Sequence, residues 1–264
     1  MKHLWIFFIF SSSIAFSQSN EYLVFFKNKE KSNINTLNSI FSERALTKKA
    51  EIGFDYYDYP VSVNYLNKLK SFGQIINSSK WLNGVHYKTE LSQNEIQNSF
   101  SFVSSIVVLN PKSLQKESLL EIKKNNSIGD SSFYGGSFDQ LEMTNTISCL
   151  HDKNLKGNGV LIAVLDAGFP KIDSMKAFKK LRDSGRIIDT YDFEDNASFV
   201  FHKSTHGTFV SSILTADMDS NYMGSAPKAN YAFYITEIAR FERNIEEFNL
   251  VLGFERADSI GADI

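Results

Sequence analysis

The sequence predicts an α/β fold whose C-terminal half holds a mainly parallel sheet with helices on both faces, preceded by a small α+β unit. An uninterrupted apolar run at 160–165 is typical of a strand that is buried on both faces of a parallel sheet. Further strand-like runs alternate with segments of helical periodicity, which is the pattern of strand–helix–strand units. Shorter patterns and turn signals mark the N-terminal part instead. In order, the C-terminal half is expected to hold a helix at 141–155, strands at 160–165 and 186–193, a helix at 206–216, a strand at 229–235, a helix at 245–260 and the start of a strand at 262–264.

Residues 21–110 are expected to form the α+β unit. Ser42 is placed as the N-cap of one helix, and Ser92 with Glu95 has the spacing of a capping box at the start of another. Asn83-Gly84 separates two strand-like runs and therefore predicts a hairpin. The expected elements are strands at 22–26 and 103–109, helices at 42–52, 63–72 and 91–100, and a hairpin over 74–87.

The N-terminus has the pattern of a signal peptide over residues 1–17. A short basic start precedes an apolar run at 4–10, and Ala15 with Ser17 fits the small-residue rule of signal peptidase, so we expect cleavage before Gln18. The run is shorter than the roughly 20 apolar residues that a membrane span needs. We therefore expect a secreted or periplasmic protein with no membrane span after signal removal.

A polar segment at 111–137 without clear periodicity predicts a linker, and exposed linkers are where proteolytic nicking is easiest. The α/β unit then occupies 138–264. A net charge of −2 gives no footprint for nucleic acid, so that class of partner is not expected. Cys149 is the only cysteine, which excludes an intramolecular disulfide, and we expect it to pack as a small apolar residue on a helix.

Asp166 and His206 are the candidate site residues. Asp166 ends the strand at 160–165, and in open parallel sheets ligands gather beyond the carboxyl ends of the strands. A carboxylate there can accept a hydrogen bond from an imidazole N–H, although Asp166 taken alone is better explained as the cap of a turn. His206 opens a helix, and histidine is the usual general base near neutral pH. His202 lies four residues earlier, but it falls in a loop without further ligands, so no zinc site is expected.

Three motifs, in order, resemble those of the subtilisin-like serine proteases, or subtilases. They are the Asp block Gly159-x-x-Ile-Ala-Val-Leu-Asp166-Ala-Gly, the His block Thr205-His206-Gly-Thr, and the strand entry Gly224-Ser-Ala-Pro-Lys-Ala229. Their order is that of the subtilase triad, Asp, His and then Ser. The segments 42–45, 60–62 and 79–83 are similar to forms found in the propeptides of exported subtilases of Bacteroidetes-type bacteria. The resemblance covers nearly everything after residue 20.

The resemblance implies a secreted serine-type endopeptidase that hydrolyses peptide bonds through an acyl-enzyme, with Asp166 orienting His206 and His206 acting as the base. It implies protein or peptide substrates, and a propeptide that binds its own catalytic domain. Phe209 stands where many subtilases have a second histidine. The family's oxyanion Asn and nucleophilic Ser have no counterpart up to Ile264, so we expect an N-terminal portion of the zymogen that is inactive alone. The alternative is a non-catalytic pseudoprotease or a prodomain-like protease-binding module.

The implied chemistry requires no cofactor. Many subtilases bind a structural Ca²⁺ after the His helix, and the oxygen-rich segment Asp217, Asp219, Ser220 and Asn221 occupies that position here. Hard oxygen ligands suit the ion. A solvated acidic turn is the commoner explanation for such a segment and is the one we favour.

Overall fold

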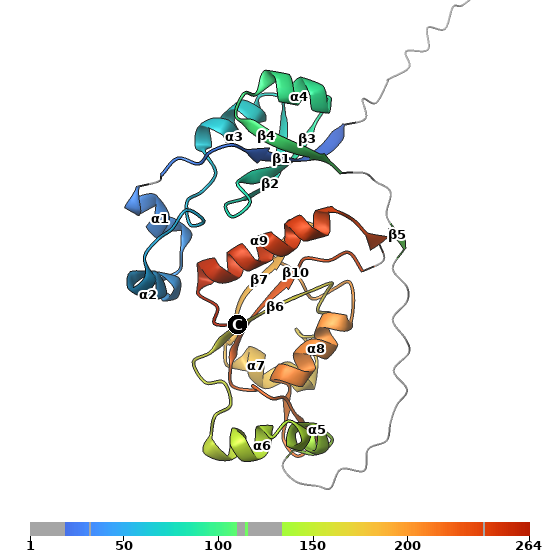
Figure 1. The fold of residues 1–264 in the computed structure, drawn as a ribbon. Coiled ribbons are helices and arrows are strands. Elements are labelled where there is room, and N and C mark those ends of the chain that lie inside the picture. The colour runs from blue at the N-terminus through green and yellow to red at the C-terminus, as the bar shows by residue number, and fades with distance from the viewer. Residues whose placement is uncertain (1–18, 32, 110–113, 116–133, 240) are drawn as a thin grey trace, which may run out of the picture.

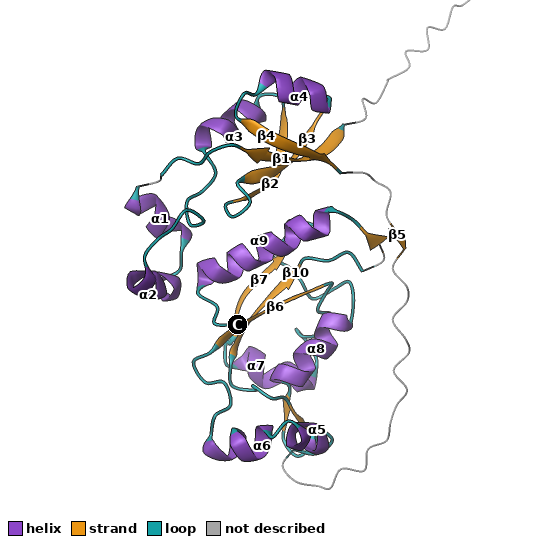
Figure 2. Cartoon of the chain, viewed as in Figure 1, coloured by secondary structure: helices purple, strands orange, loops and turns teal. Residues whose placement is uncertain are grey.

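The computed structural model describes residues 19–31, 33–109, 114–115, 134–239 and 241–264. They form an N-terminal antiparallel sheet with its helices, stacked on a parallel sheet through one long helix (Figures 1 and 2). The expected signal peptide at 1–17 and most of the expected linker at 111–137 lie outside the described residues. Among those that are described, no helix is both long and apolar enough to cross a membrane.

The N-terminal unit is a four-stranded antiparallel sheet covered by two helices on one face. The strand order is β2-β3-β1-β4. One helix connects β1 to β2 and the other connects β3 to β4, which is the ferredoxin-like βαββαβ arrangement. Alternate residues of the first strand, such as Val24, pack against both helices in one core. The elements are β1 (Asn20–Phe26), α3 (Val63–Lys70), β2 (Gly73–Ser79), β3 (Gly84–Thr89), α4 (Gln93–Ser99) and β4 (Val103–Val108).

Two further helices, α1 (Ile34–Ile40) and α2 (Glu43–Ile52), are inserted between β1 and α3. Ser42 caps α2 by accepting a hydrogen bond from the Ala45 amide at 3.1 Å, as its sequence position predicted. The capping box of Ser92 and Glu95 at the start of α4 is also confirmed. Helix α1 was not expected from the sequence; its N-cap, Asn33, accepts from Thr36 N at 2.9 Å.

The second unit is built on a three-stranded parallel sheet with the order β6-β10-β7. Its strands are β6 (Leu161–Asp166), β7 (Ile187–Asp192) and β10 (Asn230–Ile235). Helix α9 (Ile245–Ile260) covers the face towards the N-terminal unit, and α7 (Lys179–Asp183) and α8 (His206–Thr215) cover the other (Figure 1). In β10, Phe233 packs on the α8 side and Tyr234 on the α9 side, so the central strand is buried on both faces. The expected mixed α/β fold with a parallel sheet is confirmed.

Three local expectations were wrong. The single helix at 141–155 is instead α5 (Phe138–Met143), α6 (Thr146–Cys149) and the 3-10 turn η1 (His151–Lys153), because Asn145 takes a left-handed conformation with φ of 53°. Cys149 lies on a helix, but it is exposed rather than packed. Residues 262–264 are not a strand, although Asp263 N donates to Leu161 O at 2.8 Å alongside β6.

Short elements complete the second unit. The 3-10 turn η2 (Lys176–Phe178) leads into α7, and β8 (Asp217–Met218) pairs with β9 (Tyr222–Met223). A two-residue strand, β5 (Leu114–Gln115), pairs antiparallel with β11 (Phe241–Glu242), which precedes α9. Part of the expected linker therefore runs beside the loop that follows β10.

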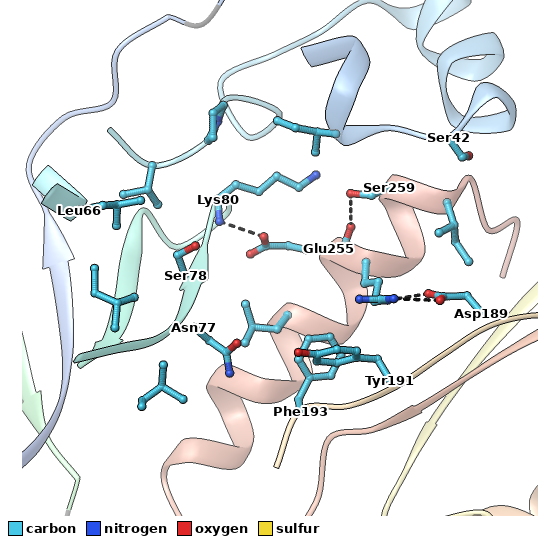
Figure 3. A pocket seen from close by; sticks show the side chains of 18 of the residues that line it. Ser42, Leu66, Asn77, Ser78, Lys80, Asp189, Tyr191, Phe193, Glu255 and Ser259 are labelled. Carbon is cyan, nitrogen blue, oxygen red and sulfur yellow. Dashed lines mark hydrogen bonds and ion pairs between the residues drawn. The ribbon is translucent and has the colours of Figure 1, made fainter. Parts of the chain in front are cut away.

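The two units meet along α9. The carboxylate of Glu255 accepts hydrogen bonds from the hydroxyl of Ser79, the last residue of β2, and from Lys80 N at 2.9 Å and Trp81 N at 3.1 Å in the turn that follows. A cavity of about 780 Å³ lies beside this contact, between β2, α9 and β7 (Figure 3). Asp189 on its β7 wall pairs with the guanidinium of Arg256 at 2.6 and 2.9 Å.

Candidate active site

Asp166 and His206 lie side by side at the carboxyl end of the parallel sheet. The ring Nδ1 of His206 is 2.7 Å from Oδ2 of Asp166. The Asp166 side chain is 8% exposed and the His206 side chain 51%, so the carboxylate is buried behind a ring that faces solvent. The second oxygen of Asp166 accepts from Ala167 N at 2.7 Å, which holds the carboxylate in one orientation.

The fold brings these residues together through close backbone contacts between the end of β6 and the start of α8. Ser204 N donates to Ala167 O at 3.2 Å and Phe169 N donates to His202 O at 3.2 Å, so the loop before His206 is tied to the segment after Asp166. Gly207 is required where the helix meets this segment, because a Cβ there would lie 2.9 Å from Asp166 Cβ. Because Gly207 has no side chain, α8 can approach closely enough for the 2.7 Å contact between the His206 ring and the Asp166 carboxylate.

The geometry assigns the proton positions of the pair. An ionised carboxylate only accepts hydrogen bonds, so the contact places the ring proton of His206 on Nδ1. In the neutral ring the other nitrogen, Nε2, then carries a lone pair and can accept a proton. A buried aspartate and a half-exposed histidine in this arrangement can act as an orienting group and a general base.

No serine hydroxyl among the described residues hydrogen-bonds to the His206 ring. The Oγ of Ser204 accepts from the backbone N–H of His206 at 3.2 Å. On α8, Ser211 is buried and donates to Gly207 O at 2.6 Å, and Ser212 donates to Phe209 O at 2.7 Å. These three hydroxyls are engaged with backbone groups, so the described part of the site is a base with its orienting partner.

A cluster of ion pairs around Lys203, which lies in the loop before His206, was not predicted from the sequence. The ammonium of Lys203 lies 2.7 Å from Asp192, 2.7 Å from Glu194 and 2.9 Å from Asp195. Asp192 is fully buried, so it needs this counter-charge. Burial opposes the charged form, but the three carboxylates raise the pKa of Lys203 above its usual value. Lys203 also forms a backbone bridge with Gly168, so the cluster fixes the loop from which His206 emerges.

The sequence signal for this cluster was three acidic residues within four positions at the end of a strand, followed by a lysine in the next loop. His202 adds a ring nitrogen 3.2 Å from Asp192. Asp192, Asp195 and His202 could therefore serve as metal ligands by their spacing, with ligand atoms within 4.8 Å of one another. The Lys203 ammonium contacts all three carboxylates and offsets one of their three negative charges, so the cluster contains a cation of its own.

The residues of the suspected calcium segment do not fit that ion. Lys180 donates to Asp217 at 2.8 Å and to Asp219 at 2.5 Å. Calcium prefers a shell of oxygen atoms, whereas here an ammonium group lies directly on both carboxylates. Burial opposes the charged form of Lys180, but the two partners raise the pKa of its ammonium above the usual value.

The remaining histidines lie outside the pair. His151 is buried, with Nε2 2.8 Å from Ser225 O and its ring stacked on Tyr134. His86 lies on β3, 3.7 Å from Glu21, and burial lowers the pKa of its ring. Among the described residues, neither the His151 ring nor the His86 ring forms a hydrogen bond with Asp166 or His206.

Comparisons with known proteins agree with the motifs. Residues 21–126 match the peptidase S8 propeptide domain of Bacteroidota, a segment that contains nearly all of the N-terminal unit. The fold is similar to the crystal structure of a mutant of the epidermin leader peptide processing serine protease (EpiP) from Staphylococcus aureus, with a TM-score of 0.51 and 15% identity. That match covers 91% of this chain and 48% of the EpiP chain, so this chain spans about half the length of EpiP. No curated protein sequence matches the chain. The resemblance to the subtilase family is confirmed, and at this identity the structural likeness concerns the fold.

Proposed function

We propose that this chain, which carries a propeptide domain of the peptidase S8 family, is the N-terminal part of the precursor of an exported subtilisin-like serine endopeptidase. The observation that carries the proposal is the 2.7 Å contact between His206 Nδ1 and Asp166 Oδ2 at the carboxyl end of a parallel sheet, downstream of that propeptide domain. Protein or peptide chains are the proposed substrates.

In the proposed reaction, His206 Nε2 removes the proton from a serine hydroxyl while that oxygen attacks the peptide carbonyl. Asp166 holds the ring in the Nδ1–H tautomer and stabilises the imidazolium that forms. The imidazolium then gives its proton to the leaving amine, and water hydrolyses the acyl-enzyme through the same base. The serine and the oxyanion donor belong to a segment beyond the residues of this chain, and the chemistry uses no cofactor.

The N-terminal unit is proposed to act as the intramolecular inhibitor of this enzyme. The pairing of β5 with β11 supports the idea, because the chain after the N-terminal sheet forms a short antiparallel pair with a two-residue strand of the second unit. Peptides commonly bind to sheet edges in this way, through backbone hydrogen bonds. Cleavage within 111–137, after an exported precursor has lost residues 1–17, would then separate inhibitor from enzyme.

The test uses the product of the reading frame continued beyond codon 264. A fluorophosphonate probe, which reacts with an activated serine hydroxyl, is expected to label that product. His206→Ala should abolish labelling, whereas His202→Gln, a matched change in the preceding loop, should leave it. Labelling that persists in His206→Ala would refute the assigned base.

The 264-residue chain alone is expected to hydrolyse no peptide, and turnover that disappears in His206→Ala would contradict this. A stop codon directly after codon 264 would instead favour the second function, a non-catalytic protease-binding module. Inhibition of a related protease by the chain would then be the activity to measure.

A further inference from the structure

Helix α2 of the N-terminal unit meets the C-terminal end of α9. Ser42 N, at the N-cap of α2, donates to Ser259 O in the last turn of α9 at 2.8 Å. Gly261 ends α9 in a left-handed conformation with φ of 78°. A Cβ at Gly261 would lie 2.8 Å from Ala45 N, so the two backbones touch where only glycine fits.

Two cations of α2 reach past this contact to the residues that follow α9. The Nε of Arg44 donates to Gly261 O at 2.9 Å, and Lys48 Nζ donates to Ala262 O at 2.9 Å. Cations near a helix C-terminus are favourable, because the last carbonyl groups carry partial negative charge. Helix α9 has no basic residue in its own last turn, so α2 supplies this charge from another part of the chain.

Both cations also bind the carboxylate of Asp263. Lys48 Nζ lies 2.7 Å from Oδ1, and an Arg44 nitrogen contacts Oδ2. The same Oδ2 accepts from Leu161 N, the first amide of β6, at 2.8 Å. Burial opposes ionisation, but Lys48, the Leu161 amide and Arg44 hold the pKa of Asp263 below its usual range.

Asp263 thereby connects α2 to β6. Its own N–H donates to Leu161 O at 2.8 Å, and Ala163 N donates to Ile264 O at 2.8 Å. Within the described residues β6 pairs with β10 on one side only, so these bonds use its other edge. The helices α1 and α2 are an insertion outside the βαββαβ arrangement, so this contact is separate from the Glu255 contact of the sheet.

We propose that α2 is a docking site for the C-terminal end of α9, and that Arg44 and Lys48 hold residues 261–264 against the edge of β6 opposite β10 by binding Asp263. The chemistry recognised is a helix C-terminus that ends in a left-handed glycine, with a carboxylate two residues later. The N-terminal unit thus organises the edge of the parallel sheet, beyond any role as an inhibitor.

The experiment measures hydrogen exchange in the 264-residue chain by NMR. In the double variant Arg44→Ala, Lys48→Ala, the amides of Leu161 and Asp263 are expected to exchange about tenfold faster, since two partly exposed charge contacts are lost. The amide of Phe233, in the central strand, should keep its rate. Lys179→Ala, which removes an exposed ion pair with Asp183 on α7, is the matched control and should change neither site.

A second variant keeps both cations. Gly261→Ala would force a Cβ against Ala45 in a left-handed conformation, so it should accelerate exchange at Asp263 in the same way. Rates at Leu161 and Asp263 that change by less than about twofold in the double variant would overturn the proposal. Equal acceleration at Phe233 would overturn it too, because that result reports global destabilisation and no local clamp.

Discussion

Glu255 lies on the face of α9 that is turned towards the N-terminal unit, and its replacement by alanine tests what holds the two units together. Its carboxylate accepts from Lys80 N at 2.9 Å, from Trp81 N at 3.1 Å and from the hydroxyl of Ser79. Burial raises the pKa of Glu255 above its usual value, against the lowering effect of these donors. The carboxylate is therefore costly to bury but satisfies three donors at once.

The expected loss follows from the two backbone donors. Glu255→Ala leaves Lys80 N and Trp81 N without an acceptor, and each unsatisfied buried donor costs about 1–3 kcal/mol. Part of this loss in stability is offset, because the variant no longer has to bury a carboxylate. We expect the free energy of unfolding to fall by about 2–4 kcal/mol, and Glu255→Gln, which keeps one carbonyl oxygen, to lose about half as much.

Urea unfolding at pH 7, followed by tryptophan fluorescence, measures the effect, because Trp81, one of the two tryptophans of the chain, lies in the turn that Glu255 binds. Glu247→Ala, at an exposed position on the same helix, is the control and should change stability by less than about 0.5 kcal/mol. If Glu255→Ala also changes the free energy of unfolding by less than about 0.5 kcal/mol and leaves Trp81 emission unchanged, Glu255 does not hold the two units together.

Three further changes probe the second unit. Lys203→Met should lower the free energy of unfolding by about 3 kcal/mol, since it leaves the buried Asp192 without its ammonium partner; urea unfolding no different from the parent would contradict this. Burial opposes ionisation of Asp189, but hydrogen bonds from Arg256 lower its pKa, so its stabilisation is present above about pH 4 and is lost as the pH falls through the folded-state pKa. The stability difference between the parent and Asp189→Asn should accordingly shrink as the pH is lowered below about 4, and a constant difference would count against it. Gly207→Ala should destabilise by about 1–3 kcal/mol in thermal unfolding, because its Cβ would press on the end of β6, and an unchanged midpoint would disprove that contact.

The strands could be predicted because their signals are local, whereas the pairing of Asp166 with His206 was expected from the order of the three motifs that resemble those of subtilases. A continuous apolar run needs only its own residues to indicate a buried strand, and Asp166 follows from where that run ends. The helix of His206 begins at the predicted residue for the same reason. Asp166 ends β6 at the carboxyl edge of the parallel sheet, and the loop between β7 and α8 brings His206 to the same edge.

The contacts that hold the units together could not be predicted, because their partners are remote in sequence. Arg44 and Asp263 are 219 positions apart, and no periodicity relates them. The helix break at Asn145 was not predicted, for a different reason. The residues around Asn145 have a helical pattern in the sequence, whereas its left-handed backbone conformation depends on tertiary packing. Exposure of Cys149 follows from that break, since the short helix α6 presents it to solvent.

The cation at the centre of the acidic loop is covalently part of the chain. A bound metal ion leaves its site when the concentration of that ion falls below the dissociation constant, whereas the Lys203 ammonium stays at a fixed local concentration beside Asp192. The counter-charge that Lys203 supplies to Asp192 is therefore kept at any divalent-ion concentration. We expect chelators to leave this one contact in place.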